Sequence, residues 1–320
     1  MQYVGIQTQQ SRNNIRSLIL LCLFPCLVIG LVFLFCFLLV IFPVEEGYEV
    51  EAQGVRDMTM QLFAQVAPYA IGGVLIWFTI AYFANAAIIN SATSSHSLLR
   101  KENKRVYNLV ENLCMSQGMK TPRVNVIEDN SLNAFASGIN ERTYTVTLSR
   151  GIINKLNDEE LEAVIAHELS HIRNRDVRLL IISIVFVGIF AMLAEIAIRT
   201  AFYSGGRSRN NKGGGGVVIL LIVALVAAMG FLFSSLMRFA ISRKREYLAD
   251  AGAAGMTKRP WALASALRKI SADPDIEAVT RDDIAQLFIE HPGKHVKGVF
   301  SGLFATHPPI KKRIQILEQF

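Results

Sequence analysis

Two histidines four residues apart, His167 and His171, enclose a glutamate at position 168. Because residues four apart lie on the same face of a helix, both imidazoles can bind a single metal ion. Glu168 is turned only about 100° from His167 around the helix axis, so its carboxylate can act as general base for a metal-activated water. If the segment is helical, this spacing predicts a site for zinc-dependent hydrolysis.

The residues before this motif predict the helix that the spacing requires. Asn157 can cap the first turn, and Glu160 stands at the third helical position, as in a capping box. Leu161, Val164 and Ile165 then follow with helical spacing. We therefore expect both histidines to lie on a well-formed helix.

A catalytic zinc site needs a third protein ligand, and residues 246–250 offer a candidate. Glu246 and Asp250 are four residues apart, so on a helix they face the same way. Glu246 would complete a set of two histidines and one glutamate, and Asp250 would accept a hydrogen bond from a ligand imidazole. The alternative is that both carboxylates belong to a solvated helix beside the membrane.

The composition favours a membrane protein. Of the 320 residues 52% are apolar, and the formal charge is +7. The basic residues lie mainly beside the apolar runs, without the stripe of aromatic and basic residues that binds single-stranded nucleic acid. Anchoring at a bilayer surface explains the charge, so we expect a lipid bilayer and no nucleic acid as partner.

Four apolar runs, at about 18–42, 68–89, 179–198 and 217–241, are predicted to cross the membrane as helices. Basic residues flank the second and fourth runs, which places both termini and the metal site in the cytoplasm by the positive-inside rule. The glycine-rich linker 203–216 contradicts this rule because it holds three basic residues. Either a short exterior loop tolerates them or the last two runs do not cross fully; we favour crossing.

These runs divide the chain into four parts. We expect a first membrane hairpin at 1–95, a cytoplasmic part with the histidine helix at 96–176, a second hairpin at 177–241, and a cytoplasmic part with Glu246 at 242–320. His171 precedes the third run by about 12 Å of helix, and Glu246 follows the fourth by about 8 Å. The arms of the second hairpin therefore bring these ligands to matching heights.

The expected fold class is mainly α, an integral membrane protein with four hydrophobic helices and a cytoplasmic α+β zincin-like domain. Residues 123–127 and 143–148 have the composition of strands and predict a small antiparallel sheet. The intervening Asn133, Ala134 and Phe135 are either loop filler or an edge along which a peptide substrate pairs by strand addition.

His307 stands before two prolines, in Thr306–Pro309. A histidine there could donate a hydrogen bond to the oxyanion that forms in acyl transfer. The alternative is a turn residue whose conformation the prolines fix.

In these motifs the chain resembles the HtpX family of bacterial membrane-embedded zinc metalloproteases, which are related to the CAAX prenyl proteases. The resemblance is carried by residues 167–171, 246–250, 133–135 and 306–309 and by the four apolar runs. It implies one zinc ion, held by His167, His171 and Glu246, and cleavage of misfolded membrane proteins. This quality-control role would take place at the bacterial inner membrane, with the site facing the cytoplasm.

Three alternatives stay open. A prenyl-protein protease has a similar site, although that family generally has more than four spans. A metal-regulated transporter would require polar or broken helices near the membrane midplane, where only Glu195 is a candidate. A zinc scaffold without turnover is disfavoured by the intact Glu168.

Overall fold

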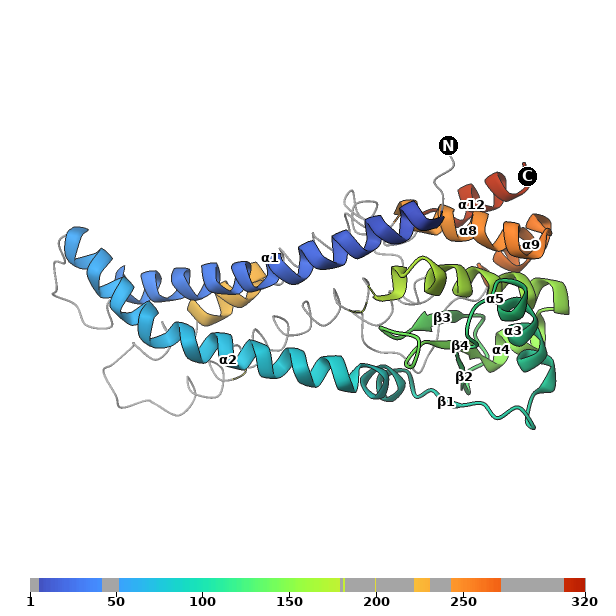
Figure 1. Cartoon of the computed structure of the whole chain (residues 1–320), viewed down its shortest axis with the longest axis horizontal. Coiled ribbons are helices and arrows are strands. Elements are labelled where there is room, and N and C mark those ends of the chain that lie inside the picture. The colour runs from blue at the N-terminus through green and yellow to red at the C-terminus, as the bar shows by residue number, and fades with distance from the viewer. Residues whose placement is uncertain are drawn as a thin grey trace. The chain divides into compact units, whose positions relative to one another are not determined.

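The computed structural model describes residues 6–41, 52–178, 181, 199, 222–230, 243–271 and 308–319 (Figure 1). The chain divides into two compact units, one made of residues 1–17, 82–182 and 238–320, the other of residues 18–81 and 183–237. Most of the predicted third and fourth apolar runs, the linker 203–216 and His307 lie outside the described residues.

Two long helices, α1 (Ile6–Ile41) and α2 (Ala52–Thr93), carry the first two apolar runs. The segment Gln53–Ala84 of α2 is long and apolar enough to span a membrane, and Pro25–Ile41 of α1 is a shorter apolar helix. Within the second unit, the rings of Phe33 and Phe63 meet edge to face, with centroids 5.6 Å apart. Large apolar side chains of α2 nevertheless face outward, among them Tyr69 and Leu75.

The first unit is built on a four-stranded sheet in the order β1-β2-β4-β3. Its strands are β1 (His96–Ser97), β2 (Arg123–Ile127), β3 (Ala134–Ser137) and β4 (Thr145–Ser149). The prediction of an antiparallel sheet was wrong, because β2 and β4 pair in parallel while β1–β2 and β3–β4 are antiparallel. The reason is that β3 pairs on the outer side of β4, which leaves β2 and β4 as neighbours with the same direction.

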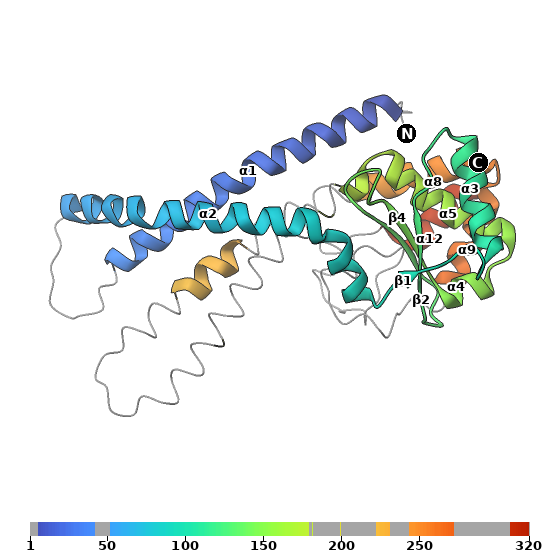
Figure 2. The ribbon, with the colours of Figure 1, turned by 60° about the horizontal axis from the view of Figure 1, so that its bottom comes forward.

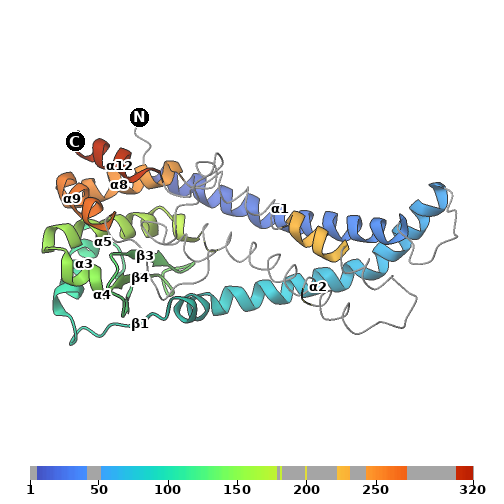
Figure 3. The same cartoon turned by 180° about the vertical axis from the view of Figure 1, so that it is seen from behind.

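Helix α5 (Asp158–Arg173) occupies the centre of the first unit, between the sheet and the layer formed by α8 (Arg243–Thr257) and α9 (Pro260–Ile270) (Figures 1 and 3). Helix α12 (Ile310–Leu317) packs on α8 and α9. Helices α3 (Lys104–Ser116) and α4 (Arg150–Lys155) complete the unit, and α3 also packs on α5 (Figure 2). The core runs through α5, where Leu161, Ile165 and Leu169 are fully buried.

The predicted start of α5 is confirmed. The side chain of Asn157 accepts a hydrogen bond from the backbone N–H of Glu160 at 2.9 Å, and the Glu160 carboxylate accepts one from the backbone N–H of Asn157 at 3.0 Å. This capping box satisfies two backbone donors that a helix start leaves without partners. The helix therefore begins at a residue that fixes which face carries the histidines.

Candidate active site

His167 and His171 lie one turn apart on α5, with their Nε2 atoms 3.2 Å from each other. Glu246 of α8 completes the group, because its carboxylate oxygens lie 3.6 Å from Nε2 of His167 and 3.4 Å from Nε2 of His171. The donor atoms of all three residues lie within 4.8 Å of one another. The structure thus brings together the three residues that the sequence proposes as metal ligands.

A glycine allows α8 to approach α5 closely enough for this arrangement. A Cβ atom added to Gly252 would lie 2.5 Å from Oγ and 3.0 Å from Cβ of Ser170 on α5. A side chain at this point would require Ser170 or one of the two helices to shift. The close contact lies one to two turns from Glu246 along α8, so it sets how near the carboxylate comes to the histidines.

Each histidine is also held through its other ring nitrogen by a buried carboxylate. Nδ1 of His167 lies 3.0 Å from Asp250, and Nδ1 of His171 lies 3.1 Å from Asp176. Such contacts favour the tautomer with hydrogen on Nδ1, which leaves the Nε2 lone pair available for a metal. Asp250 therefore lies where the sequence predicts it. Sequence reasoning missed Asp176, and its place five residues after the second histidine was the available signal.

The carboxylates make the centre a site for positive charge. Burial lowers the pKa of His171, but its hydrogen bonds with Asp176 and Glu246 outweigh burial and raise the pKa to about 10. The pKa of His167 is also raised, because hydrogen bonds with Asp250 and Glu246 outweigh the effect of burial. A metal cation can replace the protons that the imidazoles of His167 and His171 would otherwise bind.

The three candidate ligands fit a metal ion. With hydrogen on both Nδ1 atoms, the two Nε2 lone pairs face each other and the Glu246 carboxylate, an arrangement that a metal cation between them would stabilise. The separations of 3.2 to 3.6 Å between the donor atoms agree with the edge of a tetrahedron of zinc ligands, about 3.3 Å. Two imidazoles and one carboxylate are also a ligand set typical of catalytic zinc.

Glu168 is buried beside the histidines, with an exposed fraction of 3%. Burial raises the pKa of its carboxylate, and a hydrogen bond with the backbone of Ala136 in β3 partly opposes that rise. A carboxylate of raised pKa is a stronger base and is better matched to proton transfer near neutral pH. The site residue that the sequence proposes as general base thus lies in an environment suited to that role.

Arg313 of α12 is a further site residue, which sequence reasoning missed. Its guanidinium is buried, and it donates from Nε and Nη2 to the two oxygens of Asp250 at 2.9 and 2.7 Å. Nη1 lies 3.4 Å from Glu246, and Nη2 lies 3.4 Å from Nε2 of His167. A buried charge requires such pairing. Arg313 therefore links Asp250, the carboxylate beside Nδ1 of His167, to Glu246, the third candidate ligand.

Ala134 and Phe135 belong to β3, and Asn133 directly precedes this strand. All three residues are buried, and β3 is the last strand in the order of the sheet. Because Ala136 of the same strand contacts Glu168, β3 runs directly past the proposed general base. Of the proposed site residues, only His307 lies outside the described part of the chain.

Comparison with known proteins connects this geometry to a family. Residues 100–320 match the model of peptidase family M48. The Protease HtpX homolog of Bacteroides fragilis is 70% identical over 324 aligned positions, which cover 100% of both chains. The Protease HtpX homolog of Dictyoglomus thermophilum is 37% identical over 264 positions, covering 80% of this chain and 85% of the relative.

Among solved structures, the crystal structure of S. mikatae Ste24p matches with a TM-score of 0.43 and 20% sequence identity, covering 90% of this chain and 61% of that one. The resemblance to HtpX proteases that the motifs indicate is confirmed by the family match and by the full-length relative. The chain belongs to peptidase family M48.

Proposed function

We propose that this member of peptidase family M48 is a membrane-bound, zinc-dependent endopeptidase that hydrolyses peptide bonds in polypeptide substrates. The observation that carries the proposal is the convergence of His167, His171 and Glu246 within 4.8 Å, beside the buried carboxylate of Glu168. Zinc is the metal that suits two imidazoles and one carboxylate.

His167, His171 and Glu246 would hold the ion, and Asp250 and Asp176 would orient the two imidazoles. Zinc supplies a Lewis acid that lowers the pKa of water and polarises the scissile carbonyl group. The carboxylate of Glu168 takes a proton from the attacking water and passes that proton to the nitrogen of the leaving amine. Arg313 keeps Asp250 charged and in place, and His307 stays the proposed donor to the substrate oxyanion.

Strand addition along β3 is the proposed mode of substrate binding. A peptide that pairs with the outer edge of Asn133, Ala134 and Phe135 would extend the sheet by one strand. The contact between Ala136 and Glu168 supports this mode, because it ties the same strand to the general base. An extended peptide backbone would then pass the proposed general base, which suits an endopeptidase.

For the location we propose the bacterial inner membrane, with the site and both termini in the cytoplasm. The support comes from the segment Gln53–Ala84, from the apolar runs and from the basic residues that flank them. The proposed division of the chain is a hairpin at 1–95, a catalytic part at 96–176, a second hairpin at 177–241 and a catalytic part at 242–320. Misfolded membrane proteins are the proposed substrates, in a quality-control role.

Metal removal and replacement test the chemistry. The full chain, purified in detergent, is treated with a zinc chelator, its metal content is measured, and cleavage of unfolded casein is followed. We expect cleavage to fall at least about a hundredfold without metal, since neither water nor carbonyl is then activated. One equivalent of Zn²⁺ should restore cleavage, whereas Mg²⁺ should not. Full cleavage by a chain shown to be metal-free would overturn the proposal.

A further inference from the structure

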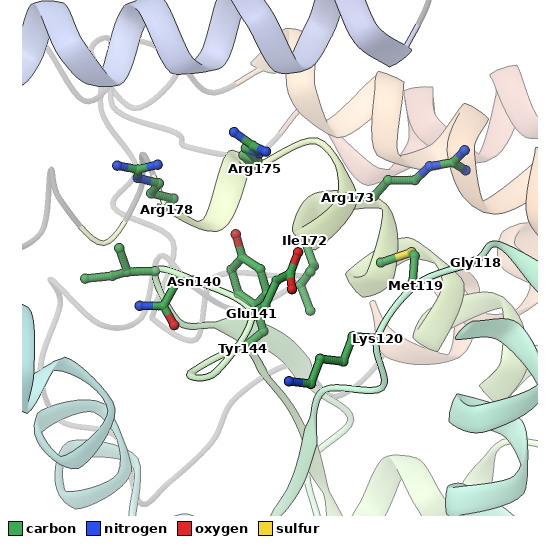
Figure 4. Close-up of a pocket in the computed structure, with 11 residues that line it drawn as sticks. Gly118, Met119, Lys120, Asn140, Glu141, Tyr144, Ile172, Arg173, Arg175 and Arg178 are labelled. Carbon is green, nitrogen blue, oxygen red and sulfur yellow. The ribbon is translucent and has the colours of Figure 1, made fainter. Parts of the chain in front are cut away.

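A cavity of about 360 Å³ lies at the C-terminal end of α5 (Figure 4). Three segments of the first unit line it, namely residues 118–120 after α3, residues 139–144 between β3 and β4, and residues 172–178 at the end of α5. None of these residues belongs to the metal-binding group. The cavity is therefore a feature for which the proposed peptidase chemistry gives no role.

The charge of the lining is strongly positive. Lys120, Arg173, Arg175 and Arg178 contribute four cations, and Glu141 is the single carboxylate, which gives a net charge of +3. Arg173 is engaged, because its Nη1 donates to Gln117 at 2.8 Å. Nε of Arg178 is buried and has no hydrogen-bond partner among the described residues. A cavity with excess cationic donors is suited to an anion.

Tyr144 adds a neutral donor to these cations. Its hydroxyl lies on the same side of the cavity as Arg175 and Arg178, and both arginines act on it electrostatically (Figure 4). Burial raises the pKa of the Tyr144 hydroxyl above its ordinary value despite the two arginines. The hydroxyl therefore keeps its proton at neutral pH and can donate it to a bound anion.

The backbone turns sharply at Arg175, directly after α5. Helix α5 ends at the C-cap Asn174, and the next residue, Arg175, has a positive φ of 60°. Glycine usually occupies this left-handed position, because a side chain there costs conformational free energy. Ser94 and Lys258 have a similar φ, so the backbone at Arg175 fixes only where its side chain leaves the chain, at the edge of the cavity.

The neighbouring sequence indicates which anion reaches the cavity. Arg178 directly precedes Leu179, where the third apolar run begins. This step rests on the topology given under the proposed function: where the third run enters the bilayer, these arginines lie at the depth of the phospholipid phosphates. An acidic substrate side chain offers similar charge, but the adjoining apolar run favours a lipid.

We propose that this cavity binds the phosphate of an anionic phospholipid, held by Arg175, Arg178 and the hydroxyl of Tyr144. Arginine can bind a phosphate through two parallel hydrogen bonds, and Lys120 adds attraction at longer range. A lipid bound here would hold the segment directly after α5, which contains Asp176 and follows the last helical turn, where His171 lies.

The test uses the full chain carrying Glu168→Gln, purified in nonionic detergent, so that the readout is independent of proteolysis. Phosphatidylglycerol, phosphatidylcholine, inorganic phosphate or a glutamate-rich peptide is titrated, and the Tm gives an apparent dissociation constant, since a ligand that binds the folded state stabilises it. The variants are Arg175→Gly and Arg178→Gln. The matched control is Lys258→Gly, because Lys258 is exposed, follows helix α8, has φ of 57° and does not line the cavity.

We expect phosphatidylglycerol to raise the Tm of the parent chain and of Lys258→Gly, and phosphatidylcholine to have little effect. The apparent dissociation constant for phosphatidylglycerol should rise about tenfold in Arg175→Gly and Arg178→Gln, which lose charge-assisted hydrogen bonds. Without lipid, both glycine variants should unfold at or above the parent Tm, since glycine tolerates the positive φ. Arg178→Gln decides the matter if Arg175→Gly does not fold.

Unchanged lipid binding in both arginine variants would overturn the proposal. An equal effect of inorganic phosphate would assign the cavity to a free anion instead, and an acidic peptide that acts where phosphatidylglycerol does not would make it a substrate subsite. Casein cleavage by the wild-type chain, measured in parallel, separates this inference from the proposed function. If wild type cleaves casein but the Glu168→Gln chain shows no lipid effect, only this inference is wrong. If the lipid effect is normal but metal-loaded wild type never cleaves, only the peptidase proposal is wrong.

Discussion

At the scale of single residues, Glu160 shows how one buried carboxylate connects two helices. Its oxygens accept hydrogen bonds from Ser265 at 2.7 Å and from Lys269 at 2.6 Å, both on α9, besides capping α5 through Asn157. Burial alone would raise the pKa of Glu160, but these hydrogen bonds outweigh burial and lower it. The charged form is therefore the one that stabilises the fold.

We predict that Glu160→Gln lowers the free energy of unfolding by about 1–3 kcal/mol at pH 7. Because the pKa is lower in the folded state, this stabilisation is complete above the unfolded pKa of about 4.3 and is lost as the pH falls through the folded value. The Tm difference between wild type and Glu160→Gln should thus be large at pH 7 and shrink below about pH 4. A difference that stays constant down to pH 3 would contradict this account.

The control is Glu159→Gln on the neighbouring residue. Glu159 lies 3.4 Å from Arg259, but the exposed fractions of the two side chains are 43% and 44%. Exposed ion pairs contribute about 0–1 kcal/mol, so this variant should unfold within a degree or two of wild type at every pH.

The residues of the site were predictable to the extent that they depend on local spacing. The two histidines lie four residues apart on one helix, with Glu168 directly after the first of them. Glu246 and Asp250 lie four residues apart on another helix, so helical spacing was enough to group each set. Arg313 was not predictable in this way. It is the third of three consecutive basic residues, a pattern typical of a solvated helix face, and only the packing of α12 on α8 and α9 buries it.

At the scale of elements, the site depends on how closely α8 approaches α5. The contact between Gly252 and Ser170 lies on the same pair of helices that carry Glu246 and the two histidines. Since a Cβ atom at 2.5 Å from another heavy atom cannot be accommodated without movement, a side chain at position 252 requires the Ser170 side chain or one of the two helices to shift.

We predict that Gly252→Ala weakens zinc binding at least about tenfold, because the shift of α8 displaces Glu246 from the two imidazoles. The measurement is a zinc titration against a competing chelator. Adding Ser170→Ala, which removes the nearest atom, should recover part of the affinity. The matched control is Gly255→Ala on the same helix, where a Cβ atom meets nothing within 4 Å. It should leave zinc affinity unchanged; equal loss in both variants would contradict the proposed role of the contact.

The sheet shows the limit of reading elements from sequence. The segments that form β2 and β4 were predicted from their composition, but composition carries no information on strand direction. The antiparallel assignment failed because the intervening β3 pairs on the far side of β4. Pairing of this kind depends on long-range contacts, whereas the helix start at Asn157 depends on residues three apart and was predicted correctly.

In the whole molecule, the proposed topology has four crossings of the bilayer. Gln53–Ala84 is apolar enough for one crossing, whereas the third and fourth runs lie largely outside the described residues. The linker between those runs, with its three basic residues, is the part of the topology that the positive-inside rule disfavours.

Labelling of single cysteines in intact cells tests the four crossings. In a chain whose four native cysteines are replaced, we predict that Tyr48→Cys and Ser208→Cys react with a membrane-impermeant thiol reagent. Lys101→Cys should react only after the cells are opened, because it follows the second run on the cytoplasmic side. Protection of Ser208→Cys in intact cells would show that the last two runs do not cross fully.

In the proposed mechanism His167, His171 and Glu246 hold zinc while Glu168 transfers the proton. Zinc content per chain and the rate of casein cleavage, measured together for wild type, Glu168→Gln and Glu246→Gln purified alike, test both roles. We expect Glu168→Gln to keep one zinc ion and to lose at least about a hundredfold in rate, whereas Glu246→Gln loses both zinc and cleavage. Cleavage by Glu168→Gln at the wild-type rate, or full zinc content in Glu246→Gln, would contradict this mechanism.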